Sequence, residues 1–378
     1  MTHNTASVDA QHLAAAARLA ARGRGRVEPN PPGGCIIANK EVVIGWGYHR
    51  YCGGPHAEIE ALERAGSAAR GATAYITLEP CNHTGRTGPC SQALIDAGIG
   101  RVVIARRDPH PIASGGLDSL ERAGMAVEVT HICPAATDIS NPFVHRIKTG
   151  LPWLTLKWAQ TVDGKLATST GDSKWISSHK SRQAVHRRRA RVDGILTGIG
   201  TVLRDDPLLT ARQVRVHRVA KRIVLDPSLN MPLDSKLVRT AEEFPTIVWT
   251  SNSALNSAAS RAAALQRCGV DVIGSEMTGV HGPLADGLRQ LTQQYDLTNL
   301  LVESGGRLLA SLLSQRLANE AWVFIAPLLL ADPAAVGLSG PAVAQIADAW
   351  RLKLHSTHRR DDDIELHYGL PGFGSPSN

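Results

Sequence analysis

The chain has few aromatic residues, few cysteines and no hydrophobic run long enough to cross a membrane. Phe, Trp and Tyr make up 4% of the 378 residues, so the cores must rest mainly on Ala, Val, Ile and Leu. The six cysteines form no regular framework, which argues against a disulfide-rich secreted protein and favours a reduced, cytoplasmic setting. No apolar stretch reaches the ~20 residues of a membrane span. Charged residues interrupt the N-terminal segment, so we expect no signal peptide either.

The remaining composition is that of an ordinary globular protein with a basic surface. Hydrophobic residues make up 43% and charged residues 20%, and the length fits two domains better than one compact core. The net charge of +7 favours acidic partners, such as nucleic acid or small phosphorylated ligands. A basic surface that only interacts with solvent explains the charge equally well.

The first part of the chain alternates between helical and strand patterns. Helices are expected at 10–21, 57–65, 91–97 and 117–123, and strands at 35–38, 42–45, 72–78, 102–105 and 126–129. The first two strands flank a polar turn and predict a β-hairpin. Strands that alternate with helices indicate βαβ units and a largely parallel sheet that is covered on both faces.

Turn-forming residues without periodicity cluster at Asn141-Pro142 and again at 149–152, so we place a domain boundary near residue 147. The second part predicts strands at 153–159, 195–197, 222–225, 246–250, 270–273 and 299–303, and a basic helix at 178–192. Later segments at 322–325, 351–355 and 364–368 predict an antiparallel end to a mixed sheet.

The segments 56–58 and 80–90 carry the clearest chemical signal. His56, Cys81 and Cys90 offer one imidazole and two thiolates, which are three ligands for a tetrahedral zinc with the fourth position open for water. Glu58, two residues from the imidazole, can move protons on and off that water. This order of residues is typical of zinc-dependent nucleobase deaminases. His83 is a spare candidate ligand, although contact with substrate or solvent suits a loop residue better.

Three blocks in the second part suggest another site, at 157–177, 198–212 and 302–309. In the last block a strand runs through Gly305-Gly306 into a helix. Such a turn suits a pyrophosphate, because glycines allow close approach and the helix N-terminus offers free N–H groups. Similar turns also occur without a ligand, so this block alone does not establish a nucleotide site.

The arginine-rich run at 187–191 has three interpretations. On a helix these side chains spread over several directions, so the run predicts mainly a solvated helix face. One arginine that points inward to a phosphate is the second possibility, and RNA binding is the third.

Together these motifs resemble the family of bifunctional riboflavin-biosynthesis proteins, in which a diaminohydroxyphosphoribosylaminopyrimidine deaminase is fused to a 5-amino-6-(5-phosphoribosylamino)uracil reductase. The resemblance rests on the long gap between Cys81 and Cys90, on the segments 29–31, 56–58, 78–81 and 108–109, and on the order of the three later blocks. It covers nearly the whole chain. It implies an α/β fold class, with an N-terminal cytidine-deaminase-like three-layer αβα domain and a C-terminal dihydrofolate-reductase-like α/β domain with a mixed sheet.

The resemblance also implies the residues of both sites. In a zinc-dependent pyrimidine deaminase domain at 1–147, Zn2+ is bound by His56, Cys81 and Cys90, while Glu58 is the catalytic proton shuttle and Asn30 contacts the substrate. In an NADPH-dependent reductase domain at 148–378, the residues expected to contact the cofactor are Ala159, Trp175, Thr201, Asp205, Gly305, Gly306, Arg307 and Leu308. Those expected to contact the ribose phosphate substrate are Lys157, Ser173, Arg189, Leu209, Arg212 and Glu303.

The implied function is a zinc-dependent hydrolytic deamination of a diaminopyrimidinone ribose phosphate, followed by NADPH reduction of its ribose to a ribityl chain. We expect a small phosphorylated pyrimidine substrate, assembly as a homo-oligomer in the cytoplasm, and no nucleic-acid or membrane partner. Two alternatives stay open. One is an RNA-acting zinc deaminase with a C-terminal basic binding module, and the other is a chain in which one domain is catalytically inactive.

Overall fold

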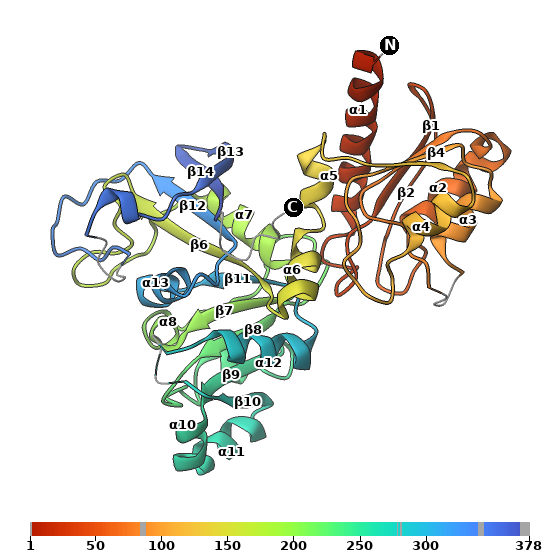
Figure 1. Ribbon diagram of the computed structural model, residues 1–378. Coiled ribbons are helices and arrows are strands. Elements are labelled where there is room, and N and C mark those ends of the chain that lie inside the picture. The colour runs from red at the N-terminus through yellow and green to blue at the C-terminus, as the bar shows by residue number, and fades with distance from the viewer. Residues whose placement is uncertain (1, 84–87, 278, 280–281, 339–343, 371–378) are drawn as a thin grey trace. The chain divides into compact units, whose positions relative to one another are not determined.

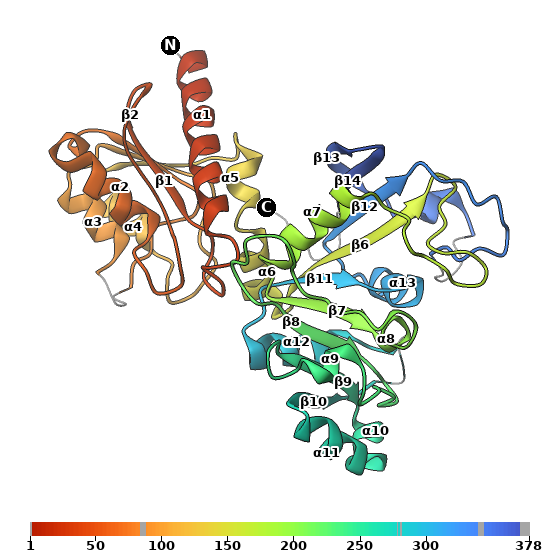
Figure 2. The ribbon, with the colours of Figure 1, turned by 180° about the vertical axis from the view of Figure 1, so that it is seen from behind.

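The computed structural model describes residues 2–83, 88–277, 279, 282–338 and 344–370. The chain forms two compact units, Met1–Thr149 and Gly150–Asn378, each built on its own sheet (Figures 1 and 2). Within the described residues, every helix is too short or too polar to span a lipid bilayer.

Unit 1 contains a five-stranded sheet with the order β2-β1-β3-β4-β5. Its strands are β1 (Gly34–Asn39), β2 (Val42–Tyr48), β3 (Thr73–Ile76), β4 (Arg101–Ile104) and β5 (Ala126–Val129). β1 and β2 form the expected antiparallel hairpin, and β3, β4 and β5 are parallel to one another. The helices are α1 (Thr2–Ala20), α2 (Ala57–Ala65), α3 (Cys90–Asp96), α4 (Gly116–Arg122), α5 (Pro134–Asp138) and α6 (Asn141–Thr149).

The central strand β1 is buried on both faces, which makes unit 1 a three-layer structure. Cys35 and Ile37 belong to a core formed with α2, α3 and α4. Ile36 and Ala38 point the other way and belong to a core formed with α1 and α5. Figure 1 shows α1 and α5 on one face of the sheet, with α2, α3 and α4 on the other. The predicted αβα architecture is therefore confirmed.

Helix α6 contradicts the prediction of irregular chain at Asn141-Pro142. Proline is tolerated in the first turn of a helix, because the N–H groups there have no intrahelical acceptor in any case. Phe143 and Val144 are buried in a small apolar cluster with Leu78. The turn-forming residues thus begin a helix with a buried apolar face, and the interpretation of Asn141-Pro142 as irregular chain was wrong.

Unit 2 contains a nine-stranded sheet with the order β10-β9-β8-β7-β11-β6-β12-β14-β13. The strands in chain order are β6 (Trp153–Thr161), β7 (Gly194–Gly198), β8 (Lys221–Leu225), β9 (Thr246–Ser251), β10 (Val270–Ser275), β11 (Asn299–Glu303), β12 (Glu320–Ala326), β13 (Lys353–Arg360) and β14 (Asp363–Gly369). All strands from β10 to β12 in the sheet order run parallel. β14 pairs antiparallel with β12 and β13, so the predicted antiparallel end of a mixed sheet is confirmed.

Helices cover both faces of this sheet. The helices are α7 (His179–Arg189), α8 (Ile199–Asp205), α9 (Lys236–Arg239), α10 (Asn252–Ser257), α11 (Ala259–Arg267), α12 (Ala285–Tyr295) and α13 (Gly306–Ser314). One core joins the sheet to α12 and α13, and the other joins it to α7, α8, α9 and α11. β11 lies between β7 and β6, so the carboxyl ends of these three strands meet at one edge of the sheet.

Two candidate active sites

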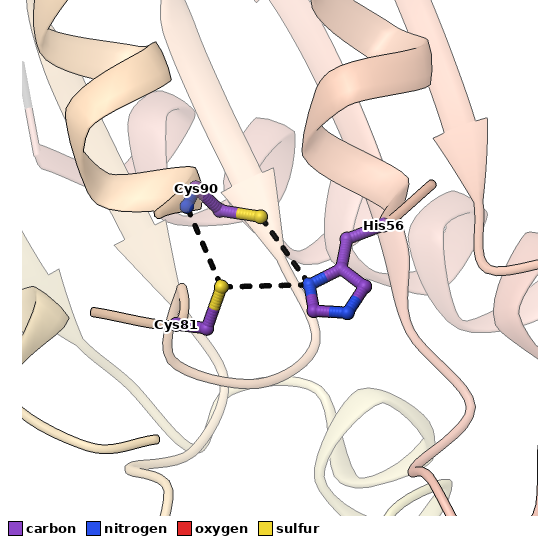
Figure 3. A group of neighbouring side chains, drawn as sticks. All are labelled: His56, Cys81 and Cys90. Carbon is purple, nitrogen blue, oxygen red and sulfur yellow. Dashed lines mark hydrogen bonds between the residues drawn. The ribbon is translucent and has the colours of Figure 1, made fainter. Parts of the chain in front are cut away.

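In unit 1 the side chains of His56, Cys81 and Cys90 converge from three elements (Figure 3). His56 is the N-cap of α2, Cys81 lies in the loop after β3, and Cys90 is the first residue of α3. His56 Nδ1 lies 3.5 Å from Cys81 Sγ and 3.3 Å from Cys90 Sγ. A tetrahedral zinc with Zn–N of ~2.1 Å and Zn–S of ~2.3 Å places its nitrogen and sulfur ligands about 3.6 Å apart. The three side chains therefore fit a zinc ion.

The electrostatics of this cluster favour a thiolate at Cys81. The hydrogen bond from Cys90 is the main cause that lowers the pKa of Cys81 to about 4. The same pairing raises the pKa of Cys90, and the hydrogen bond with Cys81 raises the pKa of His56 to about 9, so both residues must release a proton to bind a metal. The backbone N–H of Cys90 donates to Cys81 Sγ at 3.4 Å, so the first turn of α3 also stabilises a thiolate. Thiolates are the form of cysteine that binds metals.

Glu58 lies in the first turn of α2, two residues from the candidate ligand His56. Its side chain is buried, and burial raises the pKa of Glu58 to about 7. A carboxyl group with such a pKa can accept and release a proton near neutral pH. A buried carboxyl group thus lies near the three candidate ligands, where the motif predicts a proton carrier.

Two other predicted residues of unit 1, Asn30 and His83, are not part of the converging group. Asn30 is half-buried in the loop before β1, where its backbone N–H donates to Val27. A Cβ atom at Gly33 in the same loop would lie 3.8 Å from Ala57 Cβ, so this loop reaches the start of α2. His83 does not join the three residues that converge. Residues 84–87 of the long loop before Cys90 lie outside the described residues.

His49 is a buried residue beside the cluster that no sequence motif points to. Its ring lies edge-on to the ring of His56, with 5.2 Å between the centroids. Nδ1 bonds to the carbonyl of Pro55 at 2.9 Å, whereas Nε2 is buried and has no hydrogen-bond partner among the described residues. The sequence signal that could have found His49 is its position directly after β2, before the loop that leads to His56.

In unit 2, two helix N-termini lie at the edge where parallel strands end. β7 runs through Gly198 into α8, and the neighbouring strand β11 runs through Gly305 into α13. Neither N-cap glycine has a side-chain cap, so N–H groups of both first turns are available to a ligand. A Cβ atom at Gly305 or Gly200 would meet nothing within 4 Å. This edge can accept the pyrophosphate of a dinucleotide, so the residues present fit NADPH.

Most of the expected cofactor residues lie on the two helices that begin at this edge, α8 and α13. Thr201 and Asp205 lie on α8, and Arg307 is exposed in the first turn of α13. Leu308 has its side chain in the core, so only its backbone faces a ligand. Trp175 is 72% exposed and lies under the guanidinium of Arg182, 4.5 Å from the ring centroid.

A cluster of buried charges lies beside this edge, on β6, β11 and α7. Arg189 donates to both carboxylate oxygens of Glu303, at 2.6 Å and 2.9 Å. Lys157, on β6 opposite Glu303, has its Nζ 3.9 Å from the same carboxylate. Burial raises the pKa of a carboxyl, but the two cations outweigh burial and hold the pKa of Glu303 below its usual value. One arginine of the basic run thus points inward, although its partner in this structure is a carboxylate.

The segment that follows α8 brings a further cation to the cluster. Arg189 also donates to the carbonyl of Thr210 at 3.2 Å, and the backbone N–H of Arg212 donates to His186 Nδ1 at 3.3 Å. Burial and the charge of Arg189 lower the pKa of Arg212, which indicates that two guanidinium groups lie close together. Neighbouring guanidinium groups suit a phosphate. Leu209 packs its side chain into the core, which leaves its backbone for any ligand.

Ser173 lies in the segment between β6 and α7, which approaches α8. A Cβ atom at Gly171 would lie 3.1 Å from the Arg204 guanidinium carbon of that helix. Ser173 is half-buried and its carbonyl accepts the backbone N–H of Ile176. The same segment carries Trp175, so both predicted residues sit on a chain segment that reaches the Arg204 side chain of α8. Ala159 lies on β6, two residues beyond Lys157.

Two family models match the chain, one in each unit. Residues 6–106 match the cytidine and deoxycytidylate deaminase zinc-binding region, and residues 152–366 match the RibD C-terminal domain. The two matched segments contain the zinc cluster and the cofactor edge, respectively.

Full-length relatives agree with both matches. The chain is 39% identical to the riboflavin biosynthesis protein RibD of Aquifex aeolicus, over 96% of this chain and 98% of the relative. It is 36% identical to the RibD protein of Escherichia coli, over 95% and 98% of the two chains. Among solved structures, Acinetobacter baumannii RibD matches with a TM-score of 0.83 and 34% identity, over 96% of this chain and 99% of that one. The Thermotoga maritima diaminohydroxyphosphoribosylaminopyrimidine deaminase/5-amino-6-(5-phosphoribosylamino)uracil reductase matches with a TM-score of 0.81 and 29% identity, over 97% and 99%. The chain therefore belongs to the RibD family of bifunctional riboflavin biosynthesis proteins, zinc- and NADPH-dependent enzymes that join a deaminase to a reductase.

Proposed function

We propose that unit 1 deaminates 2,5-diamino-6-(5-phosphoribosylamino)pyrimidin-4(3H)-one, and that unit 2 then reduces the ribose of 5-amino-6-(5-phosphoribosylamino)uracil. The observation that carries the proposal is the convergence of His56, Cys81 and Cys90, whose ligand atoms lie within 4.8 Å of one another. An RNA-acting deaminase gains no support, since residues 152–366 match the RibD C-terminal domain.

In the deaminase step, His56, Cys81 and Cys90 hold the zinc and Glu58 moves the proton. Zinc, when bound, acts as a Lewis acid that makes water a better nucleophile at neutral pH. The Glu58 carboxylate accepts the protons of the attacking water in turn, and delivers one to the ring nitrogen beside C2 and the other to the departing amino group. The C–N bond at the 2-position breaks, a carbonyl forms in its place, and ammonia leaves. Asn30, in the loop that reaches the start of α2, is proposed to contact the substrate.

In the reductase step, unit 2 orients a phosphorylated sugar beside the cofactor edge. NADPH, when bound, supplies the hydride that reduces the ribose C1′ of the ring-opened imine form. The first turns of α8 and α13, with Thr201, Asp205, and Gly305 to Leu308, are proposed to bind the dinucleotide, together with Ala159 and Trp175. Arg189 and Arg212 are proposed to bind the 5′-phosphate, because guanidinium groups donate paired hydrogen bonds to phosphate oxygens. The remaining substrate contacts are proposed to come from Lys157, Ser173, Leu209 and Glu303.

The setting of the enzyme forms part of the same proposal. Cys35, Cys81, Cys90 and Cys133 are buried free thiols, which suits a reducing, cytoplasmic location. The substrates are small phosphorylated molecules, so the proposal needs no nucleic-acid partner. The expected homo-oligomer stays a prediction.

The Glu58→Gln variant tests the assignment of the proton carrier. We expect ammonia release from the diaminopyrimidinone substrate to fall by about 10²- to 10⁴-fold, because an amide cannot relay the proton. NADPH oxidation with pre-deaminated substrate should stay at the wild-type rate. The matched control is Glu60→Gln, since Glu60 is buried on the same helix but pairs with Arg50 and Arg64. Ammonia release near the wild-type rate in Glu58→Gln would show that Glu58 is not the proton carrier.

A further inference from the structure

Glu79 is a buried residue that lies two positions before the zinc ligand Cys81, and the deaminase chemistry does not use it. Its side chain is 7% exposed, and its carboxylate accepts three backbone N–H groups from another part of the chain. Oε2 accepts from Asp108 at 3.0 Å, and Oε1 accepts from Gly115 at 3.0 Å and from Leu117 at 3.1 Å. Both carboxylate oxygens are therefore committed to one segment, residues 108–117.

This segment leads from the end of β4 into α4. The N-cap of α4 is Gly115, which has no side chain to cap the helix. Glu79 supplies the missing cap from outside, because its Oε1 accepts the free N–H groups of the first turn. A carboxylate at this end of a helix is also favoured by the helix dipole. The same carboxylate holds the start of the segment through Asp108, so both ends of residues 108–117 are attached to one side chain.

The segment packs closely on the residues that carry Cys81. A Cβ atom at Gly116 would lie 1.9 Å from the carbonyl oxygen of Pro80, so backbone meets backbone with no space for a side chain. The N–H of Asn82 donates to the carbonyl of Ala113 at 3.0 Å. The 108–117 segment thus contacts residues 80–82 directly, and the neighbouring Glu79 carboxylate holds the segment in that position.

The contacts of Asn82 continue toward the second cysteine ligand. Asn82 Oδ1 accepts the hydroxyl groups of Ser91, at 2.8 Å, and Ser119, at 3.0 Å. Ser91 follows Cys90 on α3, and its N–H donates to the carbonyl of Cys81 at 3.2 Å. The position of the 108–117 segment is therefore coupled to both thiolate ligands through a short chain of hydrogen bonds.

We propose that Glu79 is a positioning residue of the deaminase, which fixes the 108–117 segment against the Cys81 loop and so sets one wall of the site. The inference rests on the proposed deaminase function of unit 1. Glu79 touches neither the ligand atoms nor, in this assignment, the substrate. Its effect on catalysis passes through the backbone of Asp108 and Gly115.

The Glu79→Gln variant removes the hydrogen bond to Asp108 and keeps those to Gly115 and Leu117. The glutamine oxygen can still accept from Gly115 and Leu117, but its NH2 group then faces the N–H of Asp108, where two donors cannot bond. We expect kcat/KM for deamination to fall by about 10- to 100-fold, mainly through a higher KM, since misplaced supporting groups typically cost this much. NADPH-dependent reduction of pre-deaminated substrate should be unchanged.

Two further measurements distinguish positioning from general destabilisation. Hydrogen exchange should become faster at the amide of Asp108 in Glu79→Gln, while bound zinc stays at the wild-type stoichiometry. The control is Asp9→Asn, because Asp9 is 3% exposed and pairs with Arg101 at the amino end of β4, away from the strand ends that carry the site. Asp9→Asn should lower the melting temperature and leave the deaminase kinetics unchanged.

The outcomes are distinct. Slower deamination with faster Asp108 exchange and full zinc content supports the proposal. Wild-type kinetics in Glu79→Gln would overturn it. An equal loss of deaminase activity in Asp9→Asn, at the same melting temperature as Glu79→Gln, would also overturn it, because general destabilisation would then explain the loss. A failure of the deaminase assignment itself would instead appear in the wild-type protein, as no ammonia release from the diaminopyrimidinone substrate with zinc present.

Discussion

Glu79, Glu303 and Glu365 are largely buried carboxylates, and each accepts more than one hydrogen bond. Glu79 accepts backbone N–H groups, whereas Glu303 accepts the guanidinium of Arg189. Burying a carboxylate is costly unless its lone pairs are satisfied. The kind of donor therefore decides the role of each carboxylate. Backbone donors fix a loop, whereas a guanidinium donor holds a second charge in place beside the proposed substrate site.

Glu365 lies on β14, and its carboxylate accepts hydrogen bonds from three side chains, those of Trp322, Arg360 and His367. Burial alone would raise the pKa of this carboxyl, but these three bonds outweigh burial and lower the pKa of Glu365 to about 2. The unfolded chain has the higher pKa and binds the proton first as the pH falls. The stabilisation is therefore complete above about pH 5 and is lost as the pH drops toward 2.

The Glu365→Gln variant should remove this acid-dependent part of the stability of unit 2. In the wild-type protein, we expect the free energy of unfolding to drop by about 3 kcal/mol across that window on account of Glu365 alone. The variant should be less stable at neutral pH and should lose less on acidification. Denaturant unfolding between pH 7 and pH 2 measures both. The control is Asp362→Asn, whose carboxylate is 77% exposed on the same hairpin, and equal pH slopes in Glu365→Gln and wild type would contradict the expectation.

At the scale of elements, α2 depends on two glycines of β2 for its position. A Cβ atom at Gly45 would lie 2.3 Å from the carbonyl oxygen of Ala61, and one at Gly47 would lie 2.2 Å from that of Ala57. The helix therefore lies directly on the backbone of the hairpin. Because His56 is the N-cap of α2, the glycines of β2 also set the position of a predicted zinc ligand.

The Gly47→Ala variant should push the start of α2 away from the sheet. We expect the free energy of unfolding of unit 1 to fall by roughly 1–3 kcal/mol, which is typical of overpacking. Zinc affinity should fall by about 10- to 100-fold, since His56 moves relative to the two thiolates. Thermal unfolding and zinc titration against a competing chelator measure the two effects. Val42→Ala is the matched control on the same strand, because Val42 is 65% exposed. Unchanged zinc affinity in Gly47→Ala would show that the position of α2 on the sheet does not determine metal binding.

The sequence predicted most elements because their patterns are local. The hairpin, α2 and the parallel strands follow from alternation, helical spacing and turn residues, and the structure has them within a few residues of the expected limits. Helix α6 was missed because Asn141-Pro142 resembles a turn in isolation, and only the buried contacts of Phe143 and Val144 make it a helix. Tertiary burial of this kind has no signature in a single short segment.

The sites were predictable for a different reason. His56, Cys81 and Cys90 are recognisable because zinc needs those side chains at that spacing, and the structure brings their ligand atoms together. His49 and the pairing of Arg189 with Glu303 depend on which strand ends become neighbours, which the sequence alone does not specify. Their roles, and those of the other site residues, stay predictions until the variants are measured.

At the scale of the whole molecule, each unit has its own sheet and its own cores. The zinc ligands all belong to unit 1, while the cofactor edge and the buried charges of Lys157, Arg189 and Glu303 belong to unit 2. A ligand that binds only the folded form of one unit stabilises that unit by mass action. Loss of zinc should therefore lower the stability and the deaminase activity of unit 1, and leave the reductase activity of unit 2 unchanged.

Removal of zinc from the purified enzyme by a chelator tests this independence. We expect ammonia release to stop, because three ligands without their metal offer no Lewis acid, while NADPH oxidation with pre-deaminated substrate continues at the wild-type rate. Unit 1 should lose about 4 kcal/mol of stability relative to protein in free zinc at a thousand times its Kd. Calorimetry should then show the transition of unit 1 at a lower temperature and that of unit 2 unmoved. Added zinc should restore both ammonia release and the first transition, and a parallel loss of NADPH oxidation would mean that the two units depend on each other for activity.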